Sequence, residues 1–239
     1  MRVRRKKRTK RLIVLLSLLL LGIVGFRNIL PNLGDVFQYH HVASGEYGWN
    51  LILVNRDNYI PDDYTVELTE LSNGQKVDSR IYPSLQEMFD AARAEGLGLF
   101  VADGYRTAET QQQILEGKIE AYKNEGYSSE EAEKKAKEWV AVPGTSEHQL
   151  GLAVDINADK SQSTSEEVYE WLSKNAYKYG FIQRYPEDKT DITHTIYEPW
   201  HYRYVGNDAA FEIFSQNICF PPPIVPVLFL SVWQVGIFP

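Results

Sequence analysis

The chain has 239 residues, of which 44% are hydrophobic, and a formal net charge of −7. This length allows one globular domain of good size with appendages, and the acidic balance gives no support for nucleic-acid binding. The single cysteine, Cys219, excludes an internal disulfide, so stability must come from the core and from any bound metal.

The first 30 residues combine a basic flank with an apolar run. Residues 1–11 hold eight Lys or Arg and no acid, and residues 12–26 are uncharged and almost wholly apolar. A membrane span needs ~20 residues, and Ile29 and Leu30 extend the run. Because no Ala-x-Ala-like cleavage site is evident, we expect a basic cytoplasmic flank at 1–11, an uncleaved signal anchor at 12–30 and an exported remainder. A cleaved signal peptide, and hence a secreted protein, is the alternative.

Without these eight positive charges, the net charge of −7 becomes −15 for the rest of the chain. We therefore expect an acidic extracytoplasmic domain that contacts the membrane only through its N-terminal segment and binds no nucleic acid.

Residues 31–47 resemble a linker, and the globular domain is expected at 48–217. It should begin with a short strand at 51–54. Ser84-x-x-Glu87 is a capping-box pattern that predicts a helix ending at Gly96, and residues 97–102 follow as a buried strand.

A second helix is expected to begin near Thr107 and to carry Gln111. Ser128-x-x-Glu131 and Thr164-x-x-Glu167 mark two more helices, the latter ending at Gly180. Residues 150–156 between them read as a buried strand. These elements predict an α+β fold with a small central antiparallel sheet flanked by helices.

From residue 218 to 239 the chain is uncharged and rich in proline. Four prolines between 221 and 226 argue against a regular membrane helix. We interpret this segment as an atypical apolar tail, exposed rather than catalytic, that arose from an altered reading frame or belongs to one lineage.

Two short segments supply the residue types of a catalytic metal site. His148, Asp155 and His201 match the three protein ligands that a catalytic zinc usually has. Asp155 lies in an otherwise apolar run, where a metal would offset the cost of burying its carboxylate. Each residue taken alone is more often a surface or capping residue, but their clustering in a chain with only three other histidines favours one metal site.

Glu198, three residues before His201, is placed to act as general base. Pro199 argues against a helix there, so the helical His-Glu-x-x-His arrangement is absent and the segment is expected to be a strand or turn.

These motifs resemble the zinc D-alanyl-D-alanine carboxypeptidases of the VanY type, peptidase family M15. The resemblance covers about residues 47–212 and is carried by Ser146-x-His148-x-x-Gly-x-Ala-x-Asp155, Glu198-Pro-Trp-His201-x-Arg-Tyr-Val-Gly, Trp49-Asn-Leu-Ile-Leu-Val-Asn and Asp103-Gly-Tyr-Arg106-Thr with Gln111. Asp103 and Thr107 stand where the family usually has serine.

The resemblance implies a hedgehog/DD-peptidase-like fold in which His148, Asp155 and His201 bind one Zn²⁺ and Glu198 is the base. It implies that Arg106 holds the substrate near its terminal carboxylate or the developing oxyanion, a task that suits a planar guanidinium. Ser146 and Gln111 are further candidates for substrate hydrogen bonds.

The implied activity is removal of the terminal D-Ala from peptidoglycan stem peptides by a monomer. The alternatives are an L,D-carboxypeptidase or endopeptidase of the same fold, and a zinc-containing module that binds wall peptides without cleaving them. The donor set also accepts other divalent ions.

Overall fold

The computed structural model describes residues 48–220. The predicted basic flank, signal anchor and linker lie outside these residues, as does most of the predicted tail. Within the described part of the chain, no helix combines the length and the hydrophobicity that crossing a membrane requires.

A four-stranded antiparallel sheet forms the centre of the domain. Its order is β3 (Leu99–Asp103), β4 (Ala153–Ala158), β6 (His201–Tyr204) and β5 (Phe181–Gln183). A separate antiparallel hairpin joins β1 (Leu68–Glu70) to β2 (Lys76–Asp78). The predicted α+β class with a small antiparallel sheet is confirmed.

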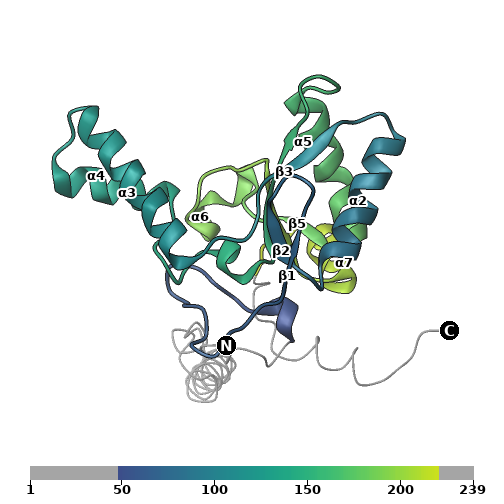
Figure 1. The fold of residues 1–239 in the computed structure, drawn as a ribbon, viewed down its shortest axis with the longest axis horizontal. Helices are drawn as coiled ribbons and strands as arrows, with labels where there is room; N and C mark the ends of the chain where they lie inside the picture. Colours follow the sequence, from purple (N-terminus) through teal and green to yellow (C-terminus); the bar gives the residue numbers. More distant parts are fainter. Residues whose placement is uncertain (1–47, 221–239) are drawn as a thin grey trace, which may run out of the picture. The chain divides into compact units, whose positions relative to one another are not determined.

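Helices surround this sheet (Figure 1). The α-helices are α2 (Tyr82–Ala94), α3 (Ala108–Asn124), α4 (Ser129–Trp139), α5 (Ser165–Asn175), α6 (Thr190–Thr193) and α7 (Asn207–Gln216). Short 3₁₀ turns are η1 (Trp49–Leu51), η2 (Glu147–Leu150), η3 (Ala176–Tyr179) and η4 (Glu187–Lys189). Figure 1 shows α2 and α5 on one side of the sheet, whereas α3 and α4 extend away from it as a pair.

The alternation of side chains along β4 separates a core face from a polar face. Val154 and Ile156 are fully buried and pack in the cluster that includes Met88 of α2 and Leu172 of α5. Asp155, between them, must point to the opposite face because successive strand residues alternate. Helices α2 and α5 therefore cover one face of β4, and Asp155 lies on the other.

Three helix starts agree with the sequence predictions. The Thr107 side chain accepts a hydrogen bond from the Thr110 amide, and Ser128 and Thr164 form complete capping boxes with Glu131 and Glu167. Such caps satisfy amides that would otherwise lack partners.

The prediction for the first long helix was wrong in its start. α2 begins at Tyr82, and Ser84 lies inside it rather than at its cap. Pro83 occupies the first turn, where proline is favoured because its missing N–H is not needed there.

Two other predictions also differ from the structure. Residues 52–54 join no sheet, because Arg203 takes up the carbonyl oxygens of Asn50 and Ile52 in place of a neighbouring strand. The helix predicted to end at Gly180 ends as an α-helix at Asn175 and continues as η3. The β1–β2 hairpin was not anticipated, since each strand has only three residues and little apolar periodicity.

The first residues of the predicted tail pack against the domain. Cys219 is 8% exposed and Phe220 is 5% exposed, and Phe220 belongs to a small core cluster with Ile182, Val205 and Ile213. The boundary at residue 217 remains a prediction, but residues 218–220 contribute to packing.

Candidate metal centre

One row of residues crosses the polar face of the sheet. In strand order, Asp103 pairs with Asp155 across β3 and β4, and Asp155 pairs with His201 across β4 and β6. Arg184 directly follows β5, and its amide donates to the His201 carbonyl. Partners directly opposite one another in antiparallel strands share a face, so this register brings together charged residues that are far apart in the sequence.

His148 reaches the same place from η2. Gly151 ends this turn with a φ of 72°, a left-handed conformation that glycine adopts without strain. The His148 Nδ1 atom lies 2.8 Å from the carbonyl oxygen of Gly104. This hydrogen bond fixes the proton on Nδ1 and leaves the lone pair of Nε2 available for a metal, as is usual when a metal-binding histidine donates its other N–H to a carbonyl oxygen.

The structure brings His148, Asp155 and His201 together as predicted. One ligand atom from each lies within 4.8 Å of the other two. The Asp155 Oδ1 atom is 3.4 Å from His148 Nε2 and 3.1 Å from His201 Nδ1. Oδ1 is buried and has no hydrogen-bond partner within residues 48–220. Two imidazoles and one carboxylate whose ligand atoms lie this close together fit a zinc ion.

The electrostatics of the cluster also favour a cation. Burial lowers the pKa of His148, despite the opposing effect of Asp155. Burial alone would lower the pKa of His201 as well, but the nearby carboxylates of Asp155 and Glu147 raise it to about 9. The two histidines hold the pKa of Asp155 well below its ordinary value, although burial acts in the opposite direction. At His201 the carboxylates thus outweigh burial and stabilise positive charge.

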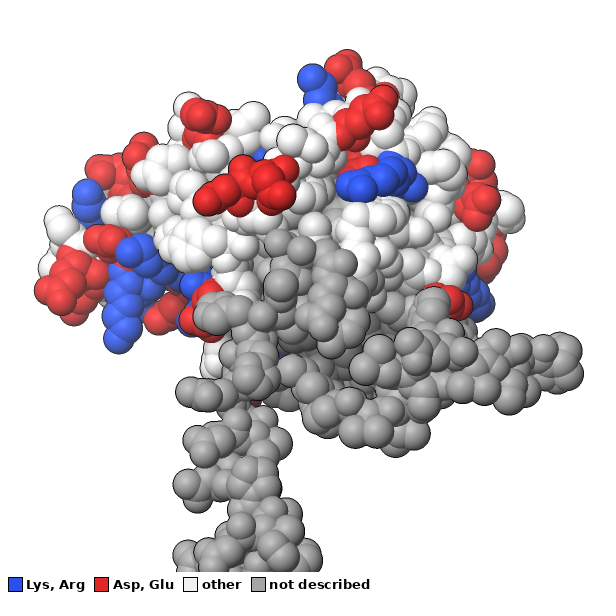
Figure 2. Space-filling view, turned by 90° about the horizontal axis from the view of Figure 1, so that it is seen from below, with Lys and Arg blue, Asp and Glu red and all other residues white. Residues whose placement is uncertain are grey.

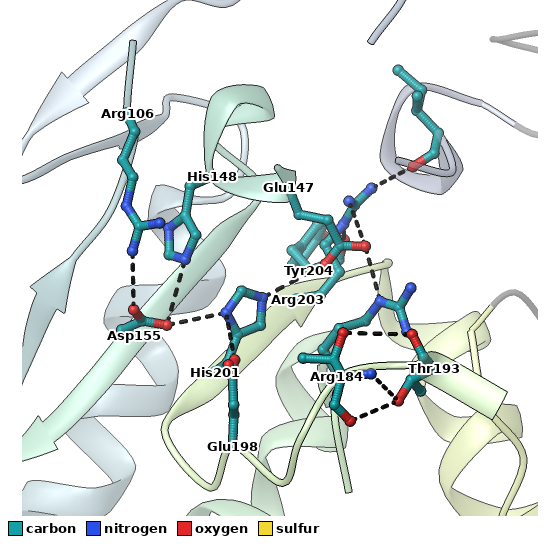
Figure 3. A network of polar contacts seen from close by, with 12 residues as sticks. Arg106, Glu147, His148, Asp155, Arg184, Thr193, Glu198, His201, Arg203 and Tyr204 are labelled. Carbon is teal, nitrogen blue, oxygen red and sulfur yellow. Dashed lines mark hydrogen bonds and ion pairs between the residues drawn. The ribbon is translucent and has the colours of Figure 1, made fainter. Parts of the chain in front are cut away.

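Glu198 lies in the turn before β6, at the edge of the cluster (Figure 3). Its Oε2 atom is 3.7 Å from His201 Nδ1, and its side chain is 13% exposed. Burial raises the pKa of Glu198, with His201 opposing and Asp155 adding to the shift. A carboxylate with a raised pKa beside a metal cluster can accept a proton and return it.

Arg106 approaches Asp155 from the side opposite His201 (Figure 3). Its Nη2 atom lies 3.4 Å from Asp155 Oδ2, and its Nε donates to Asp103 Oδ2 at 3.0 Å. The Arg106 side chain is only 15% exposed. Asp155 therefore offers one oxygen to the two histidines and the other to the arginine.

The other two candidates occupy different positions. Gln111 is 1% exposed, and both ends of its amide are used: Oε1 accepts from Arg106 Nη1 at 3.2 Å and Nε2 donates to the Ala141 carbonyl. This places Gln111 behind Arg106 as a support. Ser146 is buried two residues before His148, and its hydroxyl makes no capping hydrogen bond to η2. Their predicted contacts with substrate stay predictions.

The sequence analysis missed a second group of charged residues beside His201. Glu147 lies 3.6 Å from His201 Nε2 and contacts Arg184 and Arg203, and all three charged side chains are at most 3% exposed. One signal was available: an arginine inside the strand His201–Tyr204 needs a buried acidic partner.

A family model and two kinds of relatives match this chain. The VanY model, described as D-alanyl-D-alanine carboxypeptidase, matches residues 74–207. The chain belongs to the VanY family. A D-alanyl-D-alanine carboxypeptidase of Enterococcus faecalis (strain ATCC 700802 / V583) is 60% identical over 174 residues, which are 73% of this chain and 65% of that protein. The match thus spans slightly less than two thirds of the length of this relative.

Solved VanY structures share the fold. The structure of VanYB in complex with D-alanine-D-alanine is 61% identical, with a TM-score of 0.70, and the match covers 72% of this chain and 94% of that one. A mutant of the vancomycin-resistance D,D-pentapeptidase VanY in complex with Zn(II) gives the same identity, TM-score and coverage of this chain, and 96% of its own length is covered. The predicted fold family and the predicted resemblance are confirmed.

Proposed function

We propose that this VanY-family chain is a zinc-dependent D,D-carboxypeptidase that removes the terminal D-Ala from peptidoglycan stem peptides. The observation that carries the proposal is the placement of Glu198 and Arg106 on two sides of the three-ligand cluster. The Zn(II) and D-alanine-D-alanine complexes of the 61% identical VanY structures support the metal and the substrate class.

Each residue of the cluster has a defined task in this reaction. His148 Nε2, Asp155 Oδ1 and His201 Nδ1 would hold the metal. A zinc ion bound there supplies a Lewis acid that polarises the scissile carbonyl and makes a water molecule more acidic. Glu198 accepts the proton of the attacking water and passes it to the leaving amine of D-Ala.

Arg106 provides the positive charge that a carboxy-terminal substrate requires. A guanidinium has five N–H donors in a planar fork and can bind a carboxylate through two of them. Asp103 and Gln111 hold Arg106 from behind, so the side chain is oriented before substrate arrives. Pre-orientation reduces the entropy lost on binding.

The test is product analysis with defined peptides. The purified full-length chain in detergent, with and without chelator, is incubated with a stem pentapeptide ending in D-Ala-D-Ala and with the matching tetrapeptide, and products are read by mass. We expect D-Ala release from the pentapeptide only, loss of activity with chelator, and recovery with zinc. Cleavage of the tetrapeptide instead would indicate the L,D-carboxypeptidase alternative. Zinc binding with peptide binding but no cleavage would overturn the enzyme in favour of the binding module.

We also propose that the protein is a monomer anchored in the cytoplasmic membrane with its catalytic domain outside. Support comes from the eight basic residues and the apolar run at the N-terminus. On the face shown in Figure 2, acidic side chains lie at several places and basic ones lie beside them without forming one continuous basic surface. Protease treatment of intact spheroplasts should remove the domain, whereas release of the full-length protein by high salt would contradict the anchor.

A further inference from the structure

A carboxylate that the proposed reaction does not use lies buried behind His201. Glu147 is 2% exposed, and its Oε1 atom accepts a hydrogen bond from Arg184 Nε at 2.9 Å and lies 3.4 Å from Arg203 Nη1. Burying a charged group is costly unless it is paired. Two arginines for one glutamate are more than neutralisation requires, so the arrangement calls for a further explanation.

The sheet fixes both arginines on the face of the metal cluster. Arg203 is two residues after His201 on β6, and Arg184 is the cross-strand neighbour of His201. Arg203 is itself anchored, because its Nη2 atom donates to the carbonyl oxygens of Asn50 and Ile52. Figure 3 shows this network on the far side of His201 from Asp155.

The free oxygen of Glu147 faces the free nitrogen of His201. Glu147 Oε2 and His201 Nε2 are 3.6 Å apart, and both are buried atoms without a hydrogen-bond partner within residues 48–220. Buried polar atoms are rarely left unpaired in proteins. An approach of about 0.6 Å would give both atoms a hydrogen bond of normal length.

The two histidines of the cluster therefore direct different ring nitrogens at Asp155. His148 has its Nδ1 fixed by the Gly104 carbonyl and turns Nε2 to Asp155, whereas His201 turns Nδ1 to Asp155 and Nε2 to Glu147. A carboxylate that accepts the second N–H of a metal-binding histidine sets its tautomer and ring orientation.

We propose that Glu147 is a positioning residue that holds the His201 imidazole with its Nδ1 directed at the metal, and that Arg184 and Arg203 hold Glu147 for this task. The proposal rests on the zinc site proposed above. Arg184 Nε at 2.9 Å and Arg203 Nη1 at 3.4 Å supply the positive charge that a buried carboxylate in this position needs.

The contrasting explanation is that Glu147 only neutralises the two arginines. In that case its loss would destabilise the fold without a specific effect on metal binding. The chain offers a matched control for this: Asp78 is fully buried, forms its ion pair with Arg80, and makes no hydrogen bond or ion pair with the three candidate ligands. Asp78→Asn removes the charge of a buried carboxylate away from the metal, as Glu147→Gln does beside it.

The experiment measures zinc binding by the purified chain in competition with a chromophoric chelator, with unfolding followed in parallel. We expect Glu147→Gln to weaken zinc affinity about 10- to 100-fold, the usual effect of losing such a partner, and Glu147→Asp to recover part of it. Asp78→Asn should lower the melting temperature but leave zinc affinity within about twofold, the scatter expected of context-dependent effects. Unchanged affinity in folded Glu147→Gln would overturn the proposal.

A measurement on the unaltered protein covers the case in which Glu147→Gln does not fold. Nitrogen-15 NMR of the imidazoles in the zinc-loaded chain should find His148 protonated on Nδ1 and His201 protonated on Nε2. Protonation of His201 on Nδ1 would overturn the proposal. If the unaltered chain bound no zinc at all, the proposed function would fail instead, so the two failures are distinguishable.

Discussion

Gly104 is the position where one added methyl group should damage the metal site from outside it. A Cβ built at Gly104 would lie 2.3 Å from the carbonyl oxygen of Lys76 in β2. Ordinary contacts begin at 3.4 Å, so the Gly104 backbone or β2 must move by about 1 Å. The obstructing atom belongs to the backbone, which cannot swing aside as a flexible side chain would.

Such a movement acts directly on His148. The Gly104 carbonyl accepts the His148 Nδ1–H at 2.8 Å, and a shift of about 1 Å would carry the pair beyond hydrogen-bond range. The Tyr105 amide, which donates to the same Lys76 carbonyl, would be displaced too. We expect Gly104→Ala to cost about 1–3 kcal/mol from overpacking and to weaken zinc affinity about 10-fold or more through the lost support of His148.

Gly117→Ala is the matched control, because an added Cβ there meets nothing within 4 Å and the residue lies inside α3. It should gain up to about 1 kcal/mol, the propensity difference between glycine and alanine in a helix. Denaturant unfolding and zinc competition on both variants provide the test. A Gly104→Ala protein with wild-type stability and wild-type zinc affinity would refute the reasoning.

Three further outcomes follow from the site and from the end of the domain. Glu198→Ala should keep its zinc content but lose activity about 10²- to 10⁴-fold, the contribution of a general base, and a fully active variant would contradict that role. Asp103→Asn keeps an acceptor for Arg106 Nε and removes a partly exposed negative charge beside it. Because that charge would repel the substrate carboxylate, KM for a carboxylate-ended peptide should fall about threefold with kcat unchanged. A higher KM would show instead that the charge is needed to hold Arg106. A chain ending at Asn217 loses the buried Phe220 ring and should be less stable by about 3 kcal/mol. A chain ending at Phe220 should match the full-length chain in urea unfolding. Equal stability of the two shortened chains would mean that residues 218–220 add nothing.

The parts of this molecule that the sequence predicted well are those governed by local rules. The cap residues Thr107, Ser128 and Thr164 begin helices because their side chains satisfy amides within three residues. Asp155 was identifiable because a carboxylate in an apolar run is unusual enough to need a reason, and His148 and His201 because they cluster with it in a chain with only three other histidines. The 51–54 strand failed for the opposite cause. The carbonyl oxygens of Ile52 and of the preceding Asn50 accept from Arg203, about 150 residues away, and no local rule contains that contact.

The support of His201 could not be predicted because it depends on strand register. Glu147 directly precedes the candidate ligand His148, yet the η2 turn directs its side chain to the other candidate histidine, His201. Arg184 and Arg203 become its partners only because β5 and β6 pair in a register that places residue 184 opposite residue 201. A register slip of one residue in either strand would turn the arginine of that strand to the core face. The chain has 32 acidic residues, and a buried arginine in a strand says that one of them must be near. Only the pairing of the strands says which one, and that choice also decides which nitrogen of His201 is left for the metal.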